Sequence, residues 1–206
     1  MSNLDFETEL WQSDINYICG IDEVGRGCLA GPVLSGAVVF KDKNNLNSEM
    51  FSQINDSKKL SEIKREKLSV FIKDIAYYSI GACSSNEIDE IGIQDAVKLS
   101  MIRAIDNLVI KPEYLLIDSM KIDVDLPQKS IIKGDQISKS ISAASIIAKV
   151  ERDNLMKLSI ANKFPNYNFE KNKGYGTKKH MDAINRFGIT DIHRKSFEPI
   201  KSMIKD

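Results

Sequence analysis

Runs of apolar residues along the chain predict five short strands. They cover residues 17–21, 33–40, 76–83, 114–117 and 131–132. The second run is continuous and rich in β-branched side chains, which is the pattern of a buried strand. Two adjacent early strands followed by alternating helices and strands favour an α/β domain with a mixed central sheet.

Helical periodicity fills most of the intervals between these strands. The predicted helices cover residues 61–73, 84–108, 138–160, 178–187 and 197–204. Ser84 and Glu87 match a capping box at the start of the second helix. The last 45 or so residues carry no strand pattern, so we expect a main α/β domain over residues 1–160 and a small helical extension over 161–206.

Composition places the chain among ordinary globular proteins. Its 206 residues are 42% apolar and 28% charged, enough to bury a single core. No run approaches the ~18 apolar residues of a membrane helix, and the polar, acidic N-terminus is unlike a signal peptide. We therefore expect a cytoplasmic monomer without membrane contact. Three scattered cysteines and two distant histidines do not predict a zinc site.

The charges are unevenly distributed although the net charge is zero. Residues 1–128 carry 13 lysines and arginines against 21 aspartates and glutamates, and residues 129–206 carry 16 against 8. The basic part of the chain favours binding of a polyanion, and the acidic part favours binding of a divalent metal ion. Chance segregation on a solvated surface is the alternative.

Acidic residues at strand ends predict a metal site. Asp22 and Glu23 follow the first strand, and Asp118 ends a later one. Asp153 lies in the long helix, about two turns after a run of small residues that would let the helix approach the sheet closely. Clustered carboxylates repel one another unless cations neutralise them, and oxygen ligands suit Mg²⁺ or Mn²⁺. Any one of these acids taken alone could also be a solvated surface residue.

Four ordered motifs carry a resemblance to a known family. They are Cys19-Gly-Ile-Asp-Glu-Val-Gly-Arg-Gly27 with Ala30-Gly-Pro32; Asp56-Ser-Lys-Lys-Leu-Ser61; Lys133-Gly-Asp135 with Ser142-Ala-Ala-Ser-Ile-Ile-Ala-Lys-Val-Glu-Arg-Asp153; and Lys173-Gly-Tyr-Gly-Thr177 with His180 and Ile192-His-Arg-Lys-Ser-Phe197. Together they resemble the ribonuclease HII family over residues 17–200. The resemblance implies a ribonuclease H-like fold, a five-stranded mixed sheet flanked by helices, whose C-terminal helical extension completes the substrate cleft.

The resemblance also implies an activity. Members of the family are metal-dependent endoribonucleases that cleave the RNA strand of RNA/DNA hybrids. They also incise 5′ to single ribonucleotides embedded in duplex DNA, leaving 3′-hydroxyl and 5′-phosphate ends. The family's acidic tetrad matches Asp22, Glu23, Asp118 and Asp153 here, with two Mg²⁺ or Mn²⁺ ions as cofactors.

Substrate-reading residues are implied in two loops. Gly25, Arg26 and Gly27 would let backbone groups approach a ribose 2′-hydroxyl, the group that separates RNA from DNA. By resemblance, the ring of Tyr175 packs on the deoxyribose that follows the ribonucleotide. Candidate phosphate contacts are Lys58, Lys133, Lys173 and Thr177.

Two positions depart from the family pattern. Ser119 stands where glycine is usual, and Asn172 stands where histidine is common. Neither change removes an expected metal ligand. For His180 the sequence does not choose between a role at the site and packing on the helical extension, and His193-Arg194 could equally cap a helix end. Two alternative functions stay open: another carboxylate nuclease on the same fold, and a non-catalytic nucleic-acid-binding module.

Overall fold

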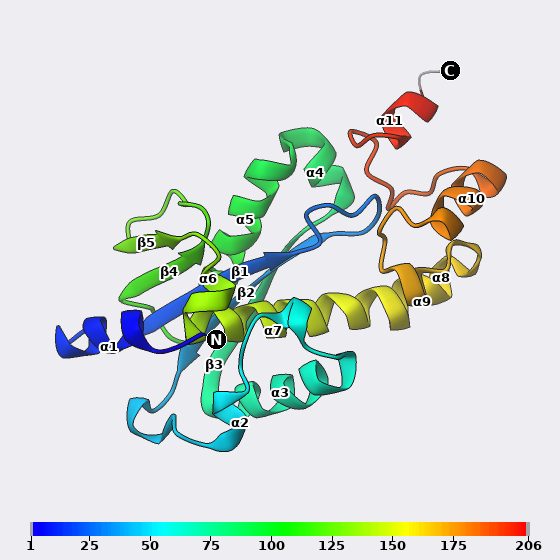
Figure 1. Cartoon of the computed structure of the whole chain (residues 1–206). Helices are drawn as coiled ribbons and strands as arrows, with labels where there is room; N and C mark the ends of the chain where they lie inside the picture. Colours follow the sequence, from blue (N-terminus) through cyan, green and yellow to red (C-terminus); the bar gives the residue numbers. More distant parts are fainter. Residues whose placement is uncertain (1, 205–206) are drawn as a thin grey trace.

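The computed structural model describes residues 2–204 and shows a five-stranded sheet covered by helices on both faces (Figure 1). The strands are β1 (Ile18–Val24), β2 (Val33–Phe40), β3 (Ala76–Cys83), β4 (Tyr114–Asp118) and β5 (Gln128–Ile131). They lie in the order β3-β2-β1-β4-β5, with β1 antiparallel to β2 and parallel to β4. The predicted α/β fold with a mixed five-stranded sheet is therefore confirmed.

All five predicted helical segments are present, some with shifted boundaries, and the structure has further short helices. They are α1 (Asp5–Gln12), α2 (Glu49–Ser52), α3 (Glu62–Ile75), α4 (Ser85–Ile91), α5 (Ile93–Asp106), α6 (Gly134–Ile137), α7 (Lys139–Asn154), α8 (Ala161–Lys163), α9 (Phe169–Asn172), α10 (Lys178–Phe187) and α11 (Ile200–Met203). The single helix predicted over 84–108 is two helices, because Gly92 adopts a φ of +80° between α4 and α5. The helix predicted to end near residue 160 changes to π-helical backbone after Asn154. Helices α1, α2, α6 and α9 were not predicted.

Helix α7 lies unusually close to the sheet, over β1 and β2. A Cβ atom on Gly20 of β1 would lie 2.1 Å from the carbonyl carbon of Ser140, and one on Gly36 of β2 would lie 2.6 Å from the carbonyl oxygen of Ala144. Any larger side chain at these two positions would push the helix away from the sheet. Helix α5 covers the opposite face, where the main hydrophobic core includes Val97 and Met101.

The alternation of side chains along β1 sets which face each acidic residue occupies. Gly20 faces α7, whereas Ile21 belongs to the core beneath α5. Two residues beyond Gly20, Asp22 faces α7, and Glu23 faces the other way. The two neighbouring carboxylates therefore leave β1 on opposite faces.

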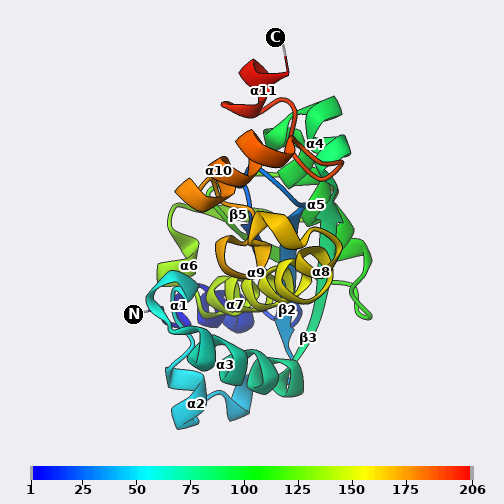
Figure 2. The ribbon, with the colours of Figure 1, turned by 90° about the vertical axis from the view of Figure 1, so that its right-hand side faces the viewer.

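The helices that follow α7 lie around its C-terminal end, in front of α7 and above it in the view of Figure 2. Their apolar side chains form a separate cluster that includes Phe169 and Ile184, and this cluster also takes in Leu29, Ala30 and Met156 from earlier parts of the chain. The loop after β1 is therefore packed directly against the C-terminal segment. Within residues 2–204, none of the helices has the length and apolar character needed to cross a membrane.

Candidate active site at the ends of β1 and β4

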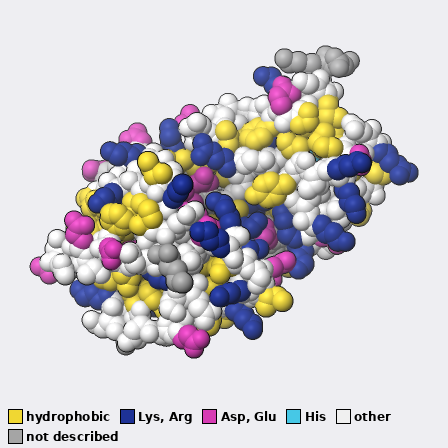
Figure 3. All heavy atoms as spheres, in the orientation of Figure 1, with side chains coloured by type: hydrophobic (Ala, Val, Ile, Leu, Met, Phe, Trp, Pro, Cys, Tyr) yellow, Lys and Arg dark blue, Asp and Glu magenta, His cyan; other side chains and the backbone are white. Residues whose placement is uncertain are grey.

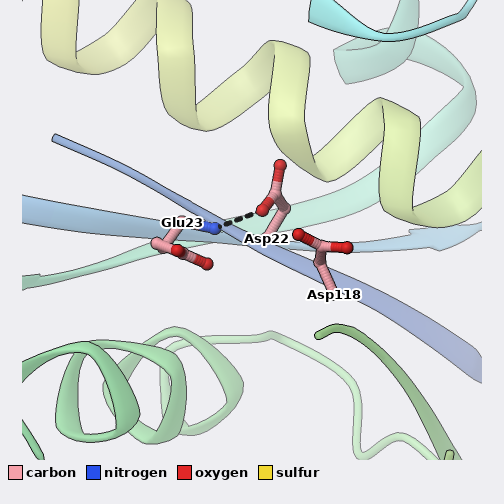
Figure 4. A group of neighbouring side chains, drawn as sticks. All are labelled: Asp22, Glu23 and Asp118. Carbon is pink, nitrogen blue, oxygen red and sulfur yellow. Dashed lines mark hydrogen bonds between the residues drawn. The ribbon is translucent and has the colours of Figure 1, made fainter. Parts of the chain in front are cut away.

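Three carboxylates meet where β1 and β4 end (Figure 4). One oxygen from each of Asp22, Glu23 and Asp118 lies within 4.8 Å of the other two. The parallel pairing of Ile21 with Ile117 brings the next residues of the two strands, Asp22 and Asp118, side by side. The sequence-based prediction that these three acids share a site is consistent with this geometry.

Hydrogen bonds fix the orientation of these carboxylates. The Glu23 backbone N–H donates to Asp22 Oδ1 at 2.8 Å. Asp118 Oδ1 accepts from the Gly134 backbone N–H at 2.6 Å and from the Ser119 hydroxyl at 3.1 Å. Ser119 has a φ of +56°, a conformation that glycine, the usual family residue here, adopts more readily. Its hydroxyl nevertheless helps to orient Asp118.

A fourth carboxylate beside this group was missed in the sequence. Asp135 follows Gly134 in α6 and is only 4% exposed. Its Oδ2 atom is buried without a hydrogen-bond partner among the described residues, and lies 3.7 Å from the Lys58 ammonium group. A buried carboxylate oxygen without a hydrogen bond is costly unless a cation compensates it. The sequence motif Lys133-Gly-Asp135 contains this aspartate, but the motif alone did not assign it to the site.

The structure does not bring Asp153 into this group. Asp153 lies eight residues after Ser145, the α7 residue whose hydroxyl lies close enough to Asp22 to lower the pKa of that carboxyl. Eight residues of α-helix span about 12 Å, so the small-residue run approaches the site while Asp153 lies further along. Its carboxylate instead accepts a hydrogen bond from Lys149 at 2.9 Å.

The ionised forms of the clustered acids are disfavoured. Burial, followed by the charge of Glu23, raises the pKa of Asp22 well above its usual range, and Asp118 and Asp135 add to the effect. Burial and the charge of Asp118 raise the pKa of Glu23, while Arg26 opposes this. Burial also raises the pKa of Asp135 against the attraction of Lys58. A bound cation would relieve this repulsion.

The donor set fits a hard divalent cation. Asp22, Glu23 and Asp118, with one oxygen each within 4.8 Å of the others, and Asp135, whose charge acts on Asp22, all offer carboxylate oxygens, the ligands that Mg²⁺ and Mn²⁺ prefer. Because burial and mutual repulsion raise the pKa values of these carboxyls, added positive charge would stabilise their ionised forms. These residues can therefore hold divalent metal.

Two buried arginines donate hydrogen bonds to the loop that follows β1, residues 25–32 (the glycine loop). Arg194 is fully buried and donates to the carbonyl oxygens of Gly25 at 2.7 Å, Arg26 at 2.9 Å and Gly31 at 2.9 Å. Arg152, also fully buried, donates to Pro32 and Ala30. Neither forms a salt bridge among residues 2–204, and backbone carbonyls accept the hydrogen bonds that both donate; the Arg194 guanidinium also lies 5.1 Å from the centre of the Phe197 ring.

Gly25 is required by this arrangement. Its φ is +90°, and a Cβ atom would lie 2.2 Å from Arg152 Nε. Gly27, in contrast, is exposed, and a Cβ atom there would meet nothing within 4 Å. Arg26 is exposed as well, and its guanidinium lies 3.7 Å from Glu23. The glycine loop therefore presents an open surface directly beside the carboxylates.

The loop that carries Tyr175, residues 173–177 (the tyrosine loop), is bonded to the glycine loop. Leu29 N–H donates to the Gly174 carbonyl at 2.8 Å, and Arg152 donates to the Lys173 carbonyl at 2.9 Å. Asn172 anchors the start of the tyrosine loop by accepting from Gly174 N–H at 2.8 Å and donating to Tyr167. Tyr175 is 40% exposed, and the Lys149 ammonium group lies 5.8 Å from the centre of its ring, so part of the ring surface is open to a ligand.

The remaining sequence candidates lie around these loops. Lys58 and Lys133 are exposed, and Lys58 forms the ion pair with Asp135. The ammonium group of Lys173 donates to the Glu170 carbonyl, and the Thr177 hydroxyl oxygen caps α10 by accepting from His180 N–H. Lysine and arginine side chains extend across the middle of the face in Figure 3 and toward the C-terminal helices. This charge distribution suits a polyanionic ligand.

Comparisons with known proteins agree with the geometry. The family model described as Ribonuclease HII matches residues 19–200. A ribonuclease HII from Macrococcus caseolyticus is 54% identical over 188 residues, which cover 91% of this chain and 69% of that protein. Among solved structures, ribonuclease H2 from Pyrococcus horikoshii superposes with a TM-score of 0.76 at 26% identity, covering 91% of this chain and 97% of that one.

A second solved structure is similar. The PCNA:RNase HII complex from Archaeoglobus fulgidus contains a chain with a TM-score of 0.74 and 27% identity, and the match covers 88% of this chain and 95% of that one. The sequence match extends over nearly all of the chain, and the sheet that carries the carboxylates is shared. This chain therefore belongs to the ribonuclease HII family and is a nuclease of the ribonuclease H type.

Proposed function

We propose that this enzyme cleaves the RNA strand of RNA/DNA hybrids and also incises 5′ to single ribonucleotides embedded in duplex DNA, leaving 3′-hydroxyl and 5′-phosphate ends. Such incision would begin the removal of ribonucleotides from DNA. The observation that carries the proposal is the hydrogen-bonded junction of the glycine loop and the tyrosine loop beside the carboxylate cluster. A hydrolytic site and two candidate sugar contacts are thereby held on one rigid frame.

Asp22, Glu23, Asp118 and Asp135 would hold two Mg²⁺ or Mn²⁺ ions. When bound, such ions supply Lewis-acid stabilisation of charge on the phosphate and activate water. Asp135 takes the place that the sequence analysis gave to Asp153, because its buried oxygen lacks a partner and its charge acts on Asp22. The ion pair of Lys58 with Asp135 places a cation at the edge of the site, where a phosphate could be contacted.

The two loops would share the task of recognising the sugar. The exposed backbone of Arg26 and Gly27 offers donors and acceptors to a 2′-hydroxyl. The exposed ring of Tyr175 offers a flat apolar surface to the next sugar, where a second 2′-hydroxyl would fit poorly. Lys133, Lys173 and Thr177 are proposed contacts to the phosphate backbone, which would position the duplex without reading its sequence.

Two asparagine variants test the proposed metal ligands. Asp135→Asn is expected to lower Mg²⁺-dependent cleavage of an RNA/DNA hybrid by at least about 100-fold, because the loss of one ligand weakens transition-state stabilisation by several kcal/mol. Asp153→Asn is expected to lower it by less than about tenfold, since only the charge of its ion pair with Lys149 is lost. The exposed Asp123→Asn is the matched control. Full activity of Asp135→Asn together with an inactive Asp153→Asn would contradict the assignment.

A further inference from the structure

The two histidines of this chain form a buried pair behind the tyrosine loop. His180 lies in α10 and His193 lies between α10 and α11, and both are fully buried. Their Nε2 atoms are 3.1 Å apart. The rings of Tyr167 and Phe169 pack against them, at centroid distances of 5.3 Å from His193 and 5.1 Å from His180. Four polar ring nitrogens are thus enclosed in an otherwise apolar cluster.

The two outer nitrogens have partners whose roles are fixed. His180 Nδ1 lies 2.9 Å from the carbonyl oxygen of Tyr175, which can only accept a hydrogen bond. His193 Nδ1 lies 2.9 Å from the backbone nitrogen of Thr190, whose N–H can only donate, and 2.9 Å from the Thr190 hydroxyl, which can donate as well; a proton on Nδ1 would oppose the backbone N–H. His180 therefore carries a proton on Nδ1, and His193 has none on its Nδ1.

These two ends determine the bond in the middle. A neutral imidazole carries one proton, so that of His193 is on Nε2 and donates to the bare Nε2 of His180. The hydrogen bonds form one directional chain from Thr190 through both rings to Tyr175. A further proton on either ring would place two N–H groups against each other. In agreement, burial and the neighbouring His180 lower the pKa of His193 to about 4, and burial lowers the pKa of His180.

The chain of hydrogen bonds ends on the residue whose side chain is offered to the ligand. The Tyr175 carbonyl also accepts from Thr177 N–H at 2.8 Å, and its own N–H donates to Asn172 at 2.9 Å. The backbone of Tyr175 is thus bonded on both sides while its ring is 40% exposed. An apolar pair would fill the same space without polar groups to satisfy, so the donor to Tyr175 is what the histidines add.

We propose that His180 and His193 are positioning residues, which fix the Tyr175 ring beside the glycine loop through a one-way chain of hydrogen bonds and so set the preference for a ribonucleotide followed by a deoxyribonucleotide. The inference rests on the proposed function, because it assigns the ring of Tyr175 to the sugar. A positioned contact group is effective only when the residues behind it are themselves held in place.

The first test measures the protons directly and does not involve activity. Long-range ¹H–¹⁵N correlation spectra of the labelled full chain contain only two imidazoles, so the signals are readily assigned. At pH 7, His180 is expected to be protonated on Nδ1 alone and His193 on Nε2 alone. Finding both rings protonated on Nε2, or either ring cationic, would overturn the proposal.

The second test uses two polar variants of similar size. In His180→Asn the amide N–H can occupy the Nδ1 position and donate to Tyr175, whereas the longer side chain of His180→Gln reaches the Nε2 position and loses that donor. The readout is the ratio of kcat/KM on a duplex with one ribonucleotide to kcat/KM on an RNA/DNA hybrid. His180→Gln is expected to lower this ratio about tenfold, the effect of one lost hydrogen bond, and His180→Asn to retain it.

The outcomes separate the two proposals. A wild-type enzyme that does not cut at single ribonucleotides would refute the proposed function, while the spectra would still report the proton positions. A wild-type enzyme with the preference, together with equal ratios in both variants, would refute the positioning role alone. Thermal midpoints of the two variants show whether each is folded. If either is not, the proton positions decide.

Discussion

Replacing Asp22 with asparagine is expected to stabilise the metal-free protein, although it removes the central ligand of the proposed metal site. Asp22 is 5% exposed and lies among other carboxylates. Burial, followed by the charge of Glu23, raises its pKa. The unfolded chain ionises this side chain near pH ~4. Stability is therefore lost as the pH rises from that value toward the raised pKa of the folded state.

The magnitude follows from the distances in the cluster. Two unit charges at the 4.8 Å limit of the group repel by about 3.5 kcal/mol at an effective dielectric constant of ~20. Lys58 and Arg26 offset part of this repulsion, and partial protonation of the acids relieves more. Asparagine has the same shape, and its side-chain oxygen can still accept the hydrogen bond from the Glu23 backbone N–H. We expect the free energy of unfolding to rise by about 1–3 kcal/mol, or about 3–8 °C in Tm.

Urea and thermal unfolding at pH 7.5 in the presence of a chelator measure the effect. The same experiment in excess Mg²⁺ is expected to reduce or invert the difference, because bound cation stabilises the folded wild type and not the variant. Asp123→Asn removes an exposed acid and serves as the control. An Asp22→Asn protein no more stable than wild type without metal, with the control unchanged, would refute the claim that repulsion in the cluster destabilises the fold.

Three further outcomes are expected. Arg194→Met leaves the Arg26 and Gly31 carbonyls of the glycine loop without a donor, and leaves the Gly25 carbonyl only the longer bond from Cys28 N–H at 3.3 Å. It should lower the free energy of unfolding by about 3–5 kcal/mol, against at most ~0.5 kcal/mol for the exposed Arg186→Met, both measured by chemical denaturation. Equal effects of the two variants would contradict this role of Arg194. Gly20→Ala places a Cβ atom 2.1 Å from the carbonyl carbon of Ser140 and should lower the free energy of unfolding by about 3 kcal/mol or more. A variant with the same Tm as wild type would exclude the close contact between α7 and the sheet. Because burial and His180 lower the pKa of His193 to about 4, the stability that its neutral ring contributes is complete above pH ~6.5 and is lost as the pH falls toward 4. The free energy of unfolding should therefore depend less on pH in a His193→Asn variant than in wild type. An unchanged pH dependence would count against a buried neutral ring.

Local signals in the sequence account for most of the predicted elements. The helix over 178–187 has its predicted bounds, because Thr177 caps its start and Gly188 ends it. The capping box of Ser84 and Glu87 is present as predicted. The break at Gly92 was missed because a single glycine inside a periodic pattern is often tolerated within a helix.

The candidate site was predictable only in part. Asp22, Glu23 and Asp118 lie at strand ends, where sheet geometry alone brings side chains together. Choosing between Asp135 and Asp153 required the position of α7 along the sheet, which small residues permit without fixing its register. That choice needed tertiary structure.

The roles of the buried arginines and histidines were also beyond local pattern. Arg194 bonds carbonyls more than 160 residues away in the chain, and no sequence spacing encodes such contacts. The pairing of His180 with His193 depends on how the segment after α10 folds back, which has no periodic signal. These are the residues for which the sequence left the role open.

The most direct test of the central claim is a gel assay of the wild-type enzyme with Mg²⁺ on duplex DNA containing one ribonucleotide, beside an all-DNA duplex of the same sequence. A carboxylate site beside a reader of the 2′-hydroxyl requires a single cut on the 5′ side of the ribonucleotide, with a 3′-hydroxyl on the released end, no cut in the all-DNA duplex, and no cut when the metal is chelated. Cleavage of both duplexes alike, or of neither with Mg²⁺ or Mn²⁺, would contradict the account.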